Sequence, residues 1–147
     1  MQIRQADQAD EKGVCDLWKM LLHFYGKERS EAVFRRSFRY AVSRPGQIQI
    51  FVAVMEEKIV GTASLHLGHY STWNDHWYGH VEDVIVVPAC RGRGVGEALI
   101  RRIIAAAAEL GLGRLELNAL ADNTAARKMY EKIGFKTDSV SYELPLG

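Results

Sequence analysis

The sequence predicts a mixed α/β fold, and three observations carry this prediction. The 147 residues suffice for one hydrophobic core but not for separate cofactor and substrate domains, so we expect residues 1–147 to form a single domain. Stretches rich in β-branched residues alternate with stretches whose apolar residues have helical spacing. From residue 81 onward the order strand, helix, strand predicts a crossover between two parallel strands.

The first elements are a strand and two helices. Residues 2–6 form a predicted strand, and Asp10 is expected to cap a helix. Apolar residues at three- and four-residue spacing define this helix, namely Val14, Leu17, Trp18, Leu21, Leu22 and Tyr25. The stretch 27–44 is rich in Lys and Arg and predicts a short, basic second helix.

A hairpin and a buried strand are expected next. Residues 48–55 and 59–67 carry β-branched patterns on either side of a polar turn, which predicts a β-hairpin. We expect residues 68–79 to be irregular. Residues 81–87 form a nearly continuous apolar run that ends at a proline, which predicts a buried strand.

The remaining elements follow in quick succession. Residues 97–110 are rich in alanine and predict a helix, and residues 114–119 predict a strand. Asn123 is expected to cap the next helix, which Gly134 closes. Residues 135–144 complete the expected fold as a final strand.

Composition excludes several classes of protein. Nineteen basic and 18 acidic residues give a net charge of +1, which supplies no global field for nucleic-acid binding. No apolar run approaches the ~20 residues of a membrane span, and the N-terminus lacks a signal-peptide pattern, so we expect a cytoplasmic protein without a membrane partner. Cys15 and Cys90 have no disulfide or metal-site spacing, and no metal is expected.

A glycine-rich turn links the buried strand to the alanine-rich helix. Glycine recurs at positions 92, 94 and 96, and Arg91 and Arg93 lie beside it. Converging backbone N–H groups and a helix N-terminus favour a phosphate or pyrophosphate ligand. No Lys-Ser or Lys-Thr follows, which argues against an NTPase loop, and the dinucleotide fingerprint is incomplete.

These residues resemble those of a known family. A strand, the pattern Pro-x-x-Arg-Gly-x-Gly-x-Gly from Pro88 and a helix, followed by Asn123, Tyr130 and Gly134-Phe135, are similar to the GCN5-related N-acetyltransferases (GNAT). The resemblance implies a mixed, mostly antiparallel sheet with a central splayed pair of parallel strands, flanked by helices. It also implies acetyl-CoA as cosubstrate. The pattern from residue 65 to residue 92 is similar to that of aminoalkylphosphonate N-acetyltransferases.

The resemblance assigns cofactor-binding residues. In this family the strand before the turn pairs with the pantetheine arm like an added strand. Carried over, this implies a pantetheine-binding segment and a pyrophosphate-binding turn, which together comprise Val84, Ile85, Val86, Arg91, Gly92, Arg93, Gly94, Val95 and Gly96. Asn123 and Tyr130 complete the expected cofactor-binding set.

Acetyl transfer to an amine needs a base for the amine and an acid for the leaving thiolate. The resemblance implies Tyr130 as the acid, and the alternative is a core tyrosine. Glu82 is the candidate base, on a face shared with Val84 and Val86, although an ion pair with an arginine explains it equally well. Glu116 is the competing base.

The acceptor site has candidates in two segments. The aromatic and histidine-rich stretch 66–80 suggests substrate contacts from His66, Trp77 and His80, while the alternative is a homodimer contact or a loop packed on itself. Arg35 and Arg39 share a face of the second helix and are candidates for holding an anionic acceptor, although such arginines are more often solvated.

We therefore expect an acetyl-CoA-dependent N-acetyltransferase that acts on a primary amine of a small polar molecule, such as an aminoalkylphosphonate or another anionic amine. One alternative is a protein N-terminal or lysine acetyltransferase. An alternative of a different class is a non-catalytic acyl-CoA sensor.

Overall fold

A five-stranded sheet in the order β1-β2-β3-β4-β5 forms the centre of residues 1–117 in the computed structural model. All neighbouring strands are antiparallel except β4 and β5, which are parallel. The mixed, mostly antiparallel sheet with one parallel pair is thus confirmed. The strands are β1 (Gln2–Gln5), β2 (Ile48–Met55), β3 (Lys58–Ser71), β4 (His76–Val86) and β5 (Arg114–Leu117).

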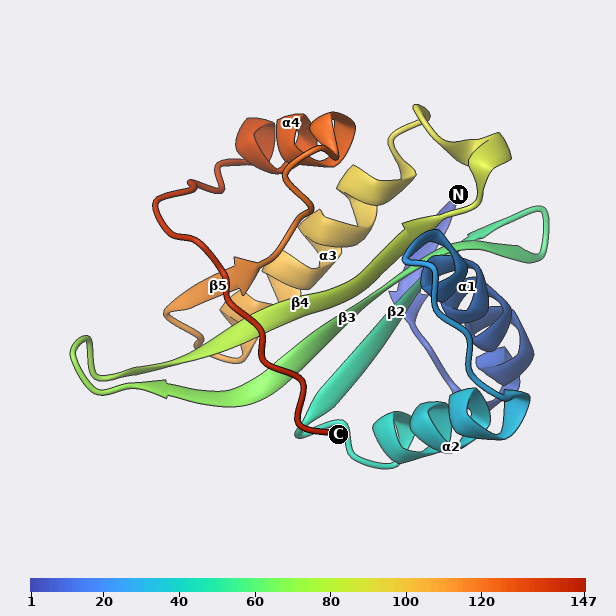
Figure 1. Ribbon diagram of the computed structural model, residues 1–147, viewed down its shortest axis with the longest axis horizontal. Coiled ribbons are helices and arrows are strands. Elements are labelled where there is room, and N and C mark those ends of the chain that lie inside the picture. The colour runs from blue at the N-terminus through green and yellow to red at the C-terminus, as the bar shows by residue number, and fades with distance from the viewer. The chain divides into compact units, whose positions relative to one another are not determined.

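Helices cover both faces of this sheet (Figure 1). On one face, α1 (Glu11–Phe24) and α2 (Glu31–Val42) enclose a core of Val14, Cys15, Phe34, Phe38, Ala41, Ile50 and Val52. On the other face, α3 (Val95–Glu109) packs so closely that a Cβ on Gly61 of β3 would lie 3.1 Å from Leu99. None of the helices combines the length and apolar character that crossing a membrane requires.

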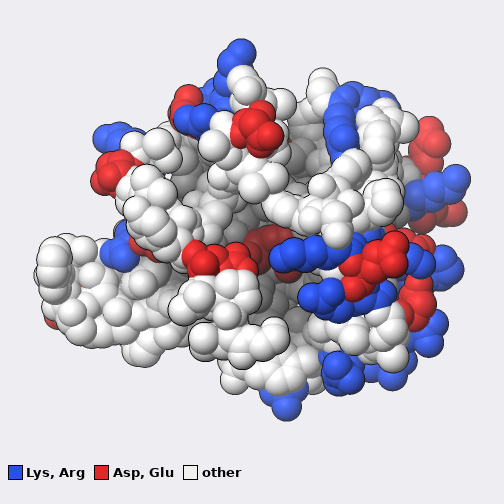
Figure 2. Space-filling view, viewed as in Figure 1, with Lys and Arg blue, Asp and Glu red and all other residues white.

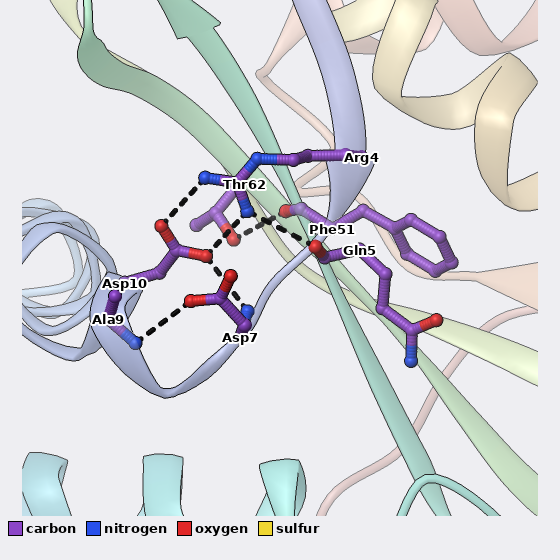
Figure 3. Close-up of polar contacts among 7 residues, drawn as sticks. All are labelled: Arg4, Gln5, Asp7, Ala9, Asp10, Phe51 and Thr62. Atoms are coloured by element: carbon purple, nitrogen blue, oxygen red, sulfur yellow. Dashed lines mark hydrogen bonds and ion pairs between the residues drawn. The ribbon is translucent and has the colours of Figure 1, made fainter.

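A partly buried ion pair fixes the start of α1 against β1 (Figure 3). Arg4 donates two hydrogen bonds to the Asp10 carboxylate, at 2.7 and 2.9 Å. The backbone N–H of Asp7 donates a third, while Asp7 caps the short 3₁₀ helix η1 (Gln8–Asp10) through the N–H of Ala9. Asp10 lies at the N-cap of α1 as expected, but its side chain caps no N–H of that helix, because Arg4 and Asp7 occupy it.

Residues 68–79 were expected to be irregular, and this expectation is wrong. They extend β3 to Ser71 and begin β4 at His76, which makes a long hairpin. Cross-strand ring contacts favour this extension, because the rings of His69 and Tyr78, like those of Tyr70 and Trp77, have centroids 5.2 Å apart.

Residues 118–147 form a second unit, which contains α4 (Thr124–Ile133). Asn123 caps α4 as expected, accepting a hydrogen bond from the N–H of Ala126 at 3.2 Å, and Gly134 ends it at a φ of +125°. The expected strand over 135–144 is wrong. No backbone hydrogen bond joins residues 136–147 to a neighbouring strand, and a strand needs such a partner. That residues 1–147 form a single domain stays a prediction.

Removing the Asp10 carboxylate should lower stability. Hydrogen bonds to charged groups contribute about 1.5–3 kcal/mol, so we expect Asp10→Asn to lower the melting temperature clearly at pH 7. The pKa of Asp10 is lowered, chiefly by its hydrogen bond to Arg4, so this contribution should shrink as the pH falls below 3.8. Asp16→Asn is the matched control, because its ion pair with Lys12 is exposed. Equal melting temperatures of the two variants at pH 7 would contradict the assignment.

Candidate active site

Strand β4 pairs with its parallel neighbour β5 over a shorter length than with its antiparallel neighbour β3. Pairing with β5 covers only Tyr78 to Val81, whereas pairing with β3 continues to Val86. No backbone hydrogen bond joins residues 82–86 to β5. An extended ligand can therefore bond to this segment as an added strand would.

The glycine-rich turn begins where β4 ends. Gly92 and Gly94 have φ values of +73° and +81°, a region that favours glycine, and a Cβ at either position would meet open space. Gly94 is the N-cap of α3, and no side chain caps the N–H groups of its first turn. These donors fit a phosphate or pyrophosphate.

Arg91 ties this turn to two other elements. Its Nε donates to the carbonyl of Val86 at 3.0 Å, and its guanidinium carbon lies 5.1 Å from the ring centroid of Phe24, at the end of α1. The guanidinium thus stays close to the end of β4. A cation there adds to the positive potential of the helix N-terminus.

A pocket of about 650 Å³ opens between the α1–α2 layer and strands β3 and β4. Its floor contains Ser64, His66 and Asp83, and its apolar wall includes Trp18, Leu21, Leu22, Val33 and Phe34. Three basic residues also line it, namely Lys27, Arg29 and Arg36. Figure 2 shows acidic side chains beside basic ones near the centre of the face drawn. The pocket therefore offers opposite charges to a single ligand.

Asp83 reaches this floor because β4 bulges there. Its φ is +55°, and the β3–β4 register shifts between Thr62 and Ser64. The residue keeps contact with solvent, yet partial burial of its carboxyl group in the surrounding protein raises the pKa of Asp83 from 3.8 to about 6, with a smaller contribution from the charge of Glu82. A carboxylate with this pKa can accept a proton near neutral pH.

The bulge also changes which residues share a face. Glu82 pairs with Ser64 before it, and Val86 pairs with Gly61 after it. Cross-strand partners share a face, so Glu82 faces the α1–α2 side with Ser64, whereas Val86 faces α3 with Gly61. The predicted alternation of Glu82, Val84 and Val86 on one face is therefore wrong.

Histidines surround the two carboxylates. His66 lines the pocket, and burial lowers its pKa, so it is neutral near pH 7. His80 Nδ1 lies 2.9 Å from Glu82 Oε1 but is not aligned for a hydrogen bond. The buried atoms Ser64 Oγ and Trp18 Nε1 have no hydrogen-bond partner. Such unsatisfied groups in a pocket wall favour a polar ligand or water.

Other predicted residues lie outside the pocket lining. The guanidinium of Arg39 binds Glu11 at 2.6 Å, and neither Arg35 nor Arg39 lines the pocket. Glu116 pairs with Arg114 at 3.0 Å on β5, and Trp77 lies on the extended hairpin. No three His, Cys, Asp or Glu side chains lie close enough together to hold a metal ion.

Tyr130 and Asn123 belong to the second unit. Tyr130 is buried in α4, and its ring centroid lies 6.0 Å from that of Phe135. Asn123 uses its side-chain oxygen as the helix cap. The acid role of Tyr130 stays a prediction.

Sequence reasoning missed four residues, namely Asp83, Lys27, Arg29 and Arg36. The adjacent Glu82 and Asp83 in an apolar strand were visible as a pair, but strict alternation assigned them to opposite faces. The three basic residues carry no motif. Only the packing of α1 and α2 over the sheet brings them to the pocket.

Residues 14–135 match the acetyltransferase (GNAT) family. Similar curated proteins include a glucosamine 6-phosphate N-acetyltransferase of Trypanosoma brucei brucei, 34% identical over 60% of this chain and 58% of that protein. The N-alpha-acetyltransferase MAK3 of Arabidopsis thaliana is 30% identical over 79% of this chain and 59% of its own length. An aminoalkylphosphonate N-acetyltransferase of Salmonella typhimurium is 23% identical over 92% of this chain and 84% of that protein. The chain thus spans less than two thirds of the length of the first two of these relatives.

Solved structures share the fold. A probable acetyltransferase superposes with a TM-score of 0.88 at 24% identity, covering 100% of this chain and 99% of that one. A predicted acetyltransferase from Clostridium acetobutylicum, solved with acetyl-CoA, gives a TM-score of 0.81 at 21% identity, covering 98% and 95%. The expected fold class is thereby confirmed.

The raised pKa of Asp83 leads to a prediction about stability. The folded state holds its proton up to about pH 6, whereas the unfolded chain releases it near 3.8, so ionisation lowers stability as the pH rises between these values. We expect Asp83→Asn to raise the melting temperature above pH 6 and to lose this advantage below pH 3.8. Thermal unfolding across this range is the measurement, and Asp75→Asn is the control. A gain that does not depend on pH would contradict the explanation.

Proposed function

The chain belongs to the acetyltransferase (GNAT) family, and on that premise we propose that it transfers an acetyl group directly from acetyl-CoA to a primary amine of a small molecule that also carries an anionic group. One observation carries the proposal: a carboxylate of raised pKa and three basic side chains line the same pocket. The Asp83 carboxylate can form a charge-assisted hydrogen bond with an ammonium group. A phosphate, phosphonate or carboxylate can form such bonds with Lys27, Arg29 and Arg36.

Acetyl-CoA, when bound, supplies a thioester whose carbonyl carbon accepts the amine. The uncapped N–H groups at the start of α3 are the proposed ligands of its pyrophosphate, together with Arg91 and Arg93. The open edge of residues 82–86 supports a pantetheine site along Val84 to Val86. The proposed pyrophosphate and pantetheine sites adjoin each other at the end of β4.

Asp83 is the proposed group that takes the proton of the acceptor ammonium, directly or through one water. Its pKa of about 6 leaves it ionised at neutral pH and still able to receive a proton. Burial keeps this pKa raised, and the negative charge of Glu82 adds a smaller contribution. Neutral His66 is a proposed hydrogen-bond partner of the acceptor. Tyr130 is the proposed donor of a proton to the leaving thiolate, as the family resemblance implies.

One named relative supports a second candidate, a protein N-terminal acetyltransferase, because the N-alpha-acetyltransferase MAK3 matches 79% of this chain. The basic pocket lining supports an acceptor that carries an anionic group, which a small anionic amine supplies. Activity on peptides and none on free anionic amines would favour the second candidate.

The central test measures free CoA thiol released with a panel of amines. We expect aminoalkylphosphonates, amino sugar phosphates or amino acids to react faster than polyamines. Loss of a general base costs about 10²- to 10⁴-fold in rate, so Asp83→Asn should lower kcat by that factor without weakening acetyl-CoA binding. For the native protein, log kcat/KM should fall with decreasing pH below about 6. Acetyl-CoA binding without turnover of any amine or peptide would instead identify a sensor.

The anion site has a separate test. Because charge-assisted hydrogen bonds contribute about 1.5–3 kcal/mol, Arg29→Ala/Arg36→Ala should raise KM for the anionic amine at least about tenfold with little change in kcat. Arg35→Ala is the matched control, since Arg35 lies on the same helix but outside the pocket lining. A larger KM effect from Arg35→Ala would support the sequence-based assignment instead.

A further inference from the structure

The helices give the pocket an apolar wall. Lining residues at helical spacing share one face of α1 and one face of α2. The apolar members of this helix wall are Trp18, Leu21, Leu22, Val33, Phe34 and Ala41. Leu21, Leu22 and Val33 are only half-buried, so part of their apolar surface stays in contact with water. A ligand that displaces this water from apolar surface gains free energy.

The helix wall is held in shape by the core behind it. Trp18 and Leu22 pack against the buried core of the α1–α2 layer, and the ring centroids of Trp18 and Phe38 lie 6.3 Å apart. Phe34 and Ala41 belong to that core and are 6% and 3% exposed. Close-packed side chains have little room to move into an adjoining gap. The helix wall is therefore a preformed apolar surface, as binding sites for small molecules commonly are.

Polar and apolar lining residues occupy different parts of the pocket. Ser64, His66 and Asp83 make the sheet side polar, whereas the helix wall is apolar. The three basic lining residues are exposed, so they lie toward the open side of the pocket. A ligand that matches all three parts carries its charged groups on one side of the molecule and hydrocarbon on the other.

The size of the pocket favours a bulky ligand. Its volume of about 650 Å³ lies within the range of ~300–1,000 Å³ for pockets that enclose drug-sized ligands. An aminoalkylphosphonate with a short, unbranched chain would leave much of the helix wall in water. A sugar phosphate would bring hydroxyls to the pocket lining, where the Tyr40 hydroxyl already donates a hydrogen bond to Gln47 at 2.8 Å. Buried hydroxyls without partners cost free energy, so the helix wall favours hydrocarbon over sugar.

We propose that the acceptor amine carries, besides its anionic group, a bulky hydrocarbon side chain that packs against the helix wall. This inference rests on the proposed function of the pocket and narrows its substrate class. Branched and aromatic amino acids, and the aminophosphonates with the same side chains, have this chemistry. Their ammonium group bonds to Asp83, their anion bonds to a basic lining residue, and their side chain covers Leu21 and Val33.

The test compares acceptors with different side chains. The rate of CoA thiol release from acetyl-CoA is measured with alanine, leucine, phenylalanine and asparagine, with the phosphonate analogue of each, and with glucosamine 6-phosphate. Leucine and asparagine are the matched pair, because their side chains have similar shapes and differ in polarity. Within either series, burial of a leucine side chain should raise kcat/KM about tenfold to a hundredfold over alanine, whereas asparagine should gain little. Glucosamine 6-phosphate should react more slowly than leucine or its phosphonate analogue.

Near-isosteric variants of the helix wall locate the contact. Leu21→Asn and Val33→Thr place polar atoms at the wall, and neither residue belongs to the packed core behind it. Each should lower the ratio of kcat/KM for leucine to that for alanine by about fourfold or more, the equivalent of one buried CH₂ group. Met20→Asn is the matched control, because Met20 lies on α1 outside the pocket lining, and it should keep the native ratio. Thermal unfolding establishes that each variant is folded.

Failure of this inference and failure of the proposed function give different results. If anionic amines react but leucine has no advantage over alanine or asparagine, the inference is overturned and the proposed function stands. An unchanged ratio in both wall variants, or an equal loss in the Met20→Asn control, would also overturn the inference. If no amine of the panel reacts, the proposed function fails, and the inference fails with it.

Discussion

Strand β4 bonds to both neighbours along its first half and to only one along its second half, and the candidate site depends on this constraint. Pairing with β5 stops at Val81, while β3 holds the strand in place as far as Val86. The released edge leaves backbone groups for an extended ligand, and the bulge at Asp83 turns a carboxylate toward the α1–α2 side. Five consecutive residues thus adjoin both proposed ligand sites, which suits a reaction that joins two substrates.

This arrangement costs stability locally. Asp83 has a positive φ and a raised pKa, and Ser64 Oγ and Trp18 Nε1 are buried without hydrogen-bond partners. Such strain is typical of functional sites and persists only where the surrounding structure holds it in place. Apolar cores on both faces of the sheet, and the Arg4–Asp10 pair at the start of α1, supply that support.

The two proposed substrate sites offer different kinds of group. The glycine-rich turn presents backbone N–H groups, whose geometry many sequences can share, whereas the pocket presents side chains from α1, α2 and the segment between them. The names of the relatives differ accordingly, from glucosamine 6-phosphate to aminoalkylphosphonate acetyltransferases. Shared fold and turn therefore do not determine the acceptor, and the argument for an anionic amine depends on Lys27, Arg29 and Arg36.

The sequence by itself determined the order of the elements up to α4, the parallel pair and the glycine-rich turn. These features are encoded locally, by apolar periodicity, by caps such as Asn123 and by glycines that alone tolerate the required φ. The tertiary structure decided three other features: the length of the β3–β4 hairpin, the absence of a strand over 135–144, and the orientation of Asp83. Each depends on hydrogen bonds or packing between segments distant in sequence, as when Thr62 and Ser64 set the register around the bulge. For the same reason, only the fold places Arg29 and Arg36 in the pocket lining and pairs Arg39 with Glu11. Helix periodicity indicates which residues share a face of the helix, but it does not indicate which part of the protein that face contacts.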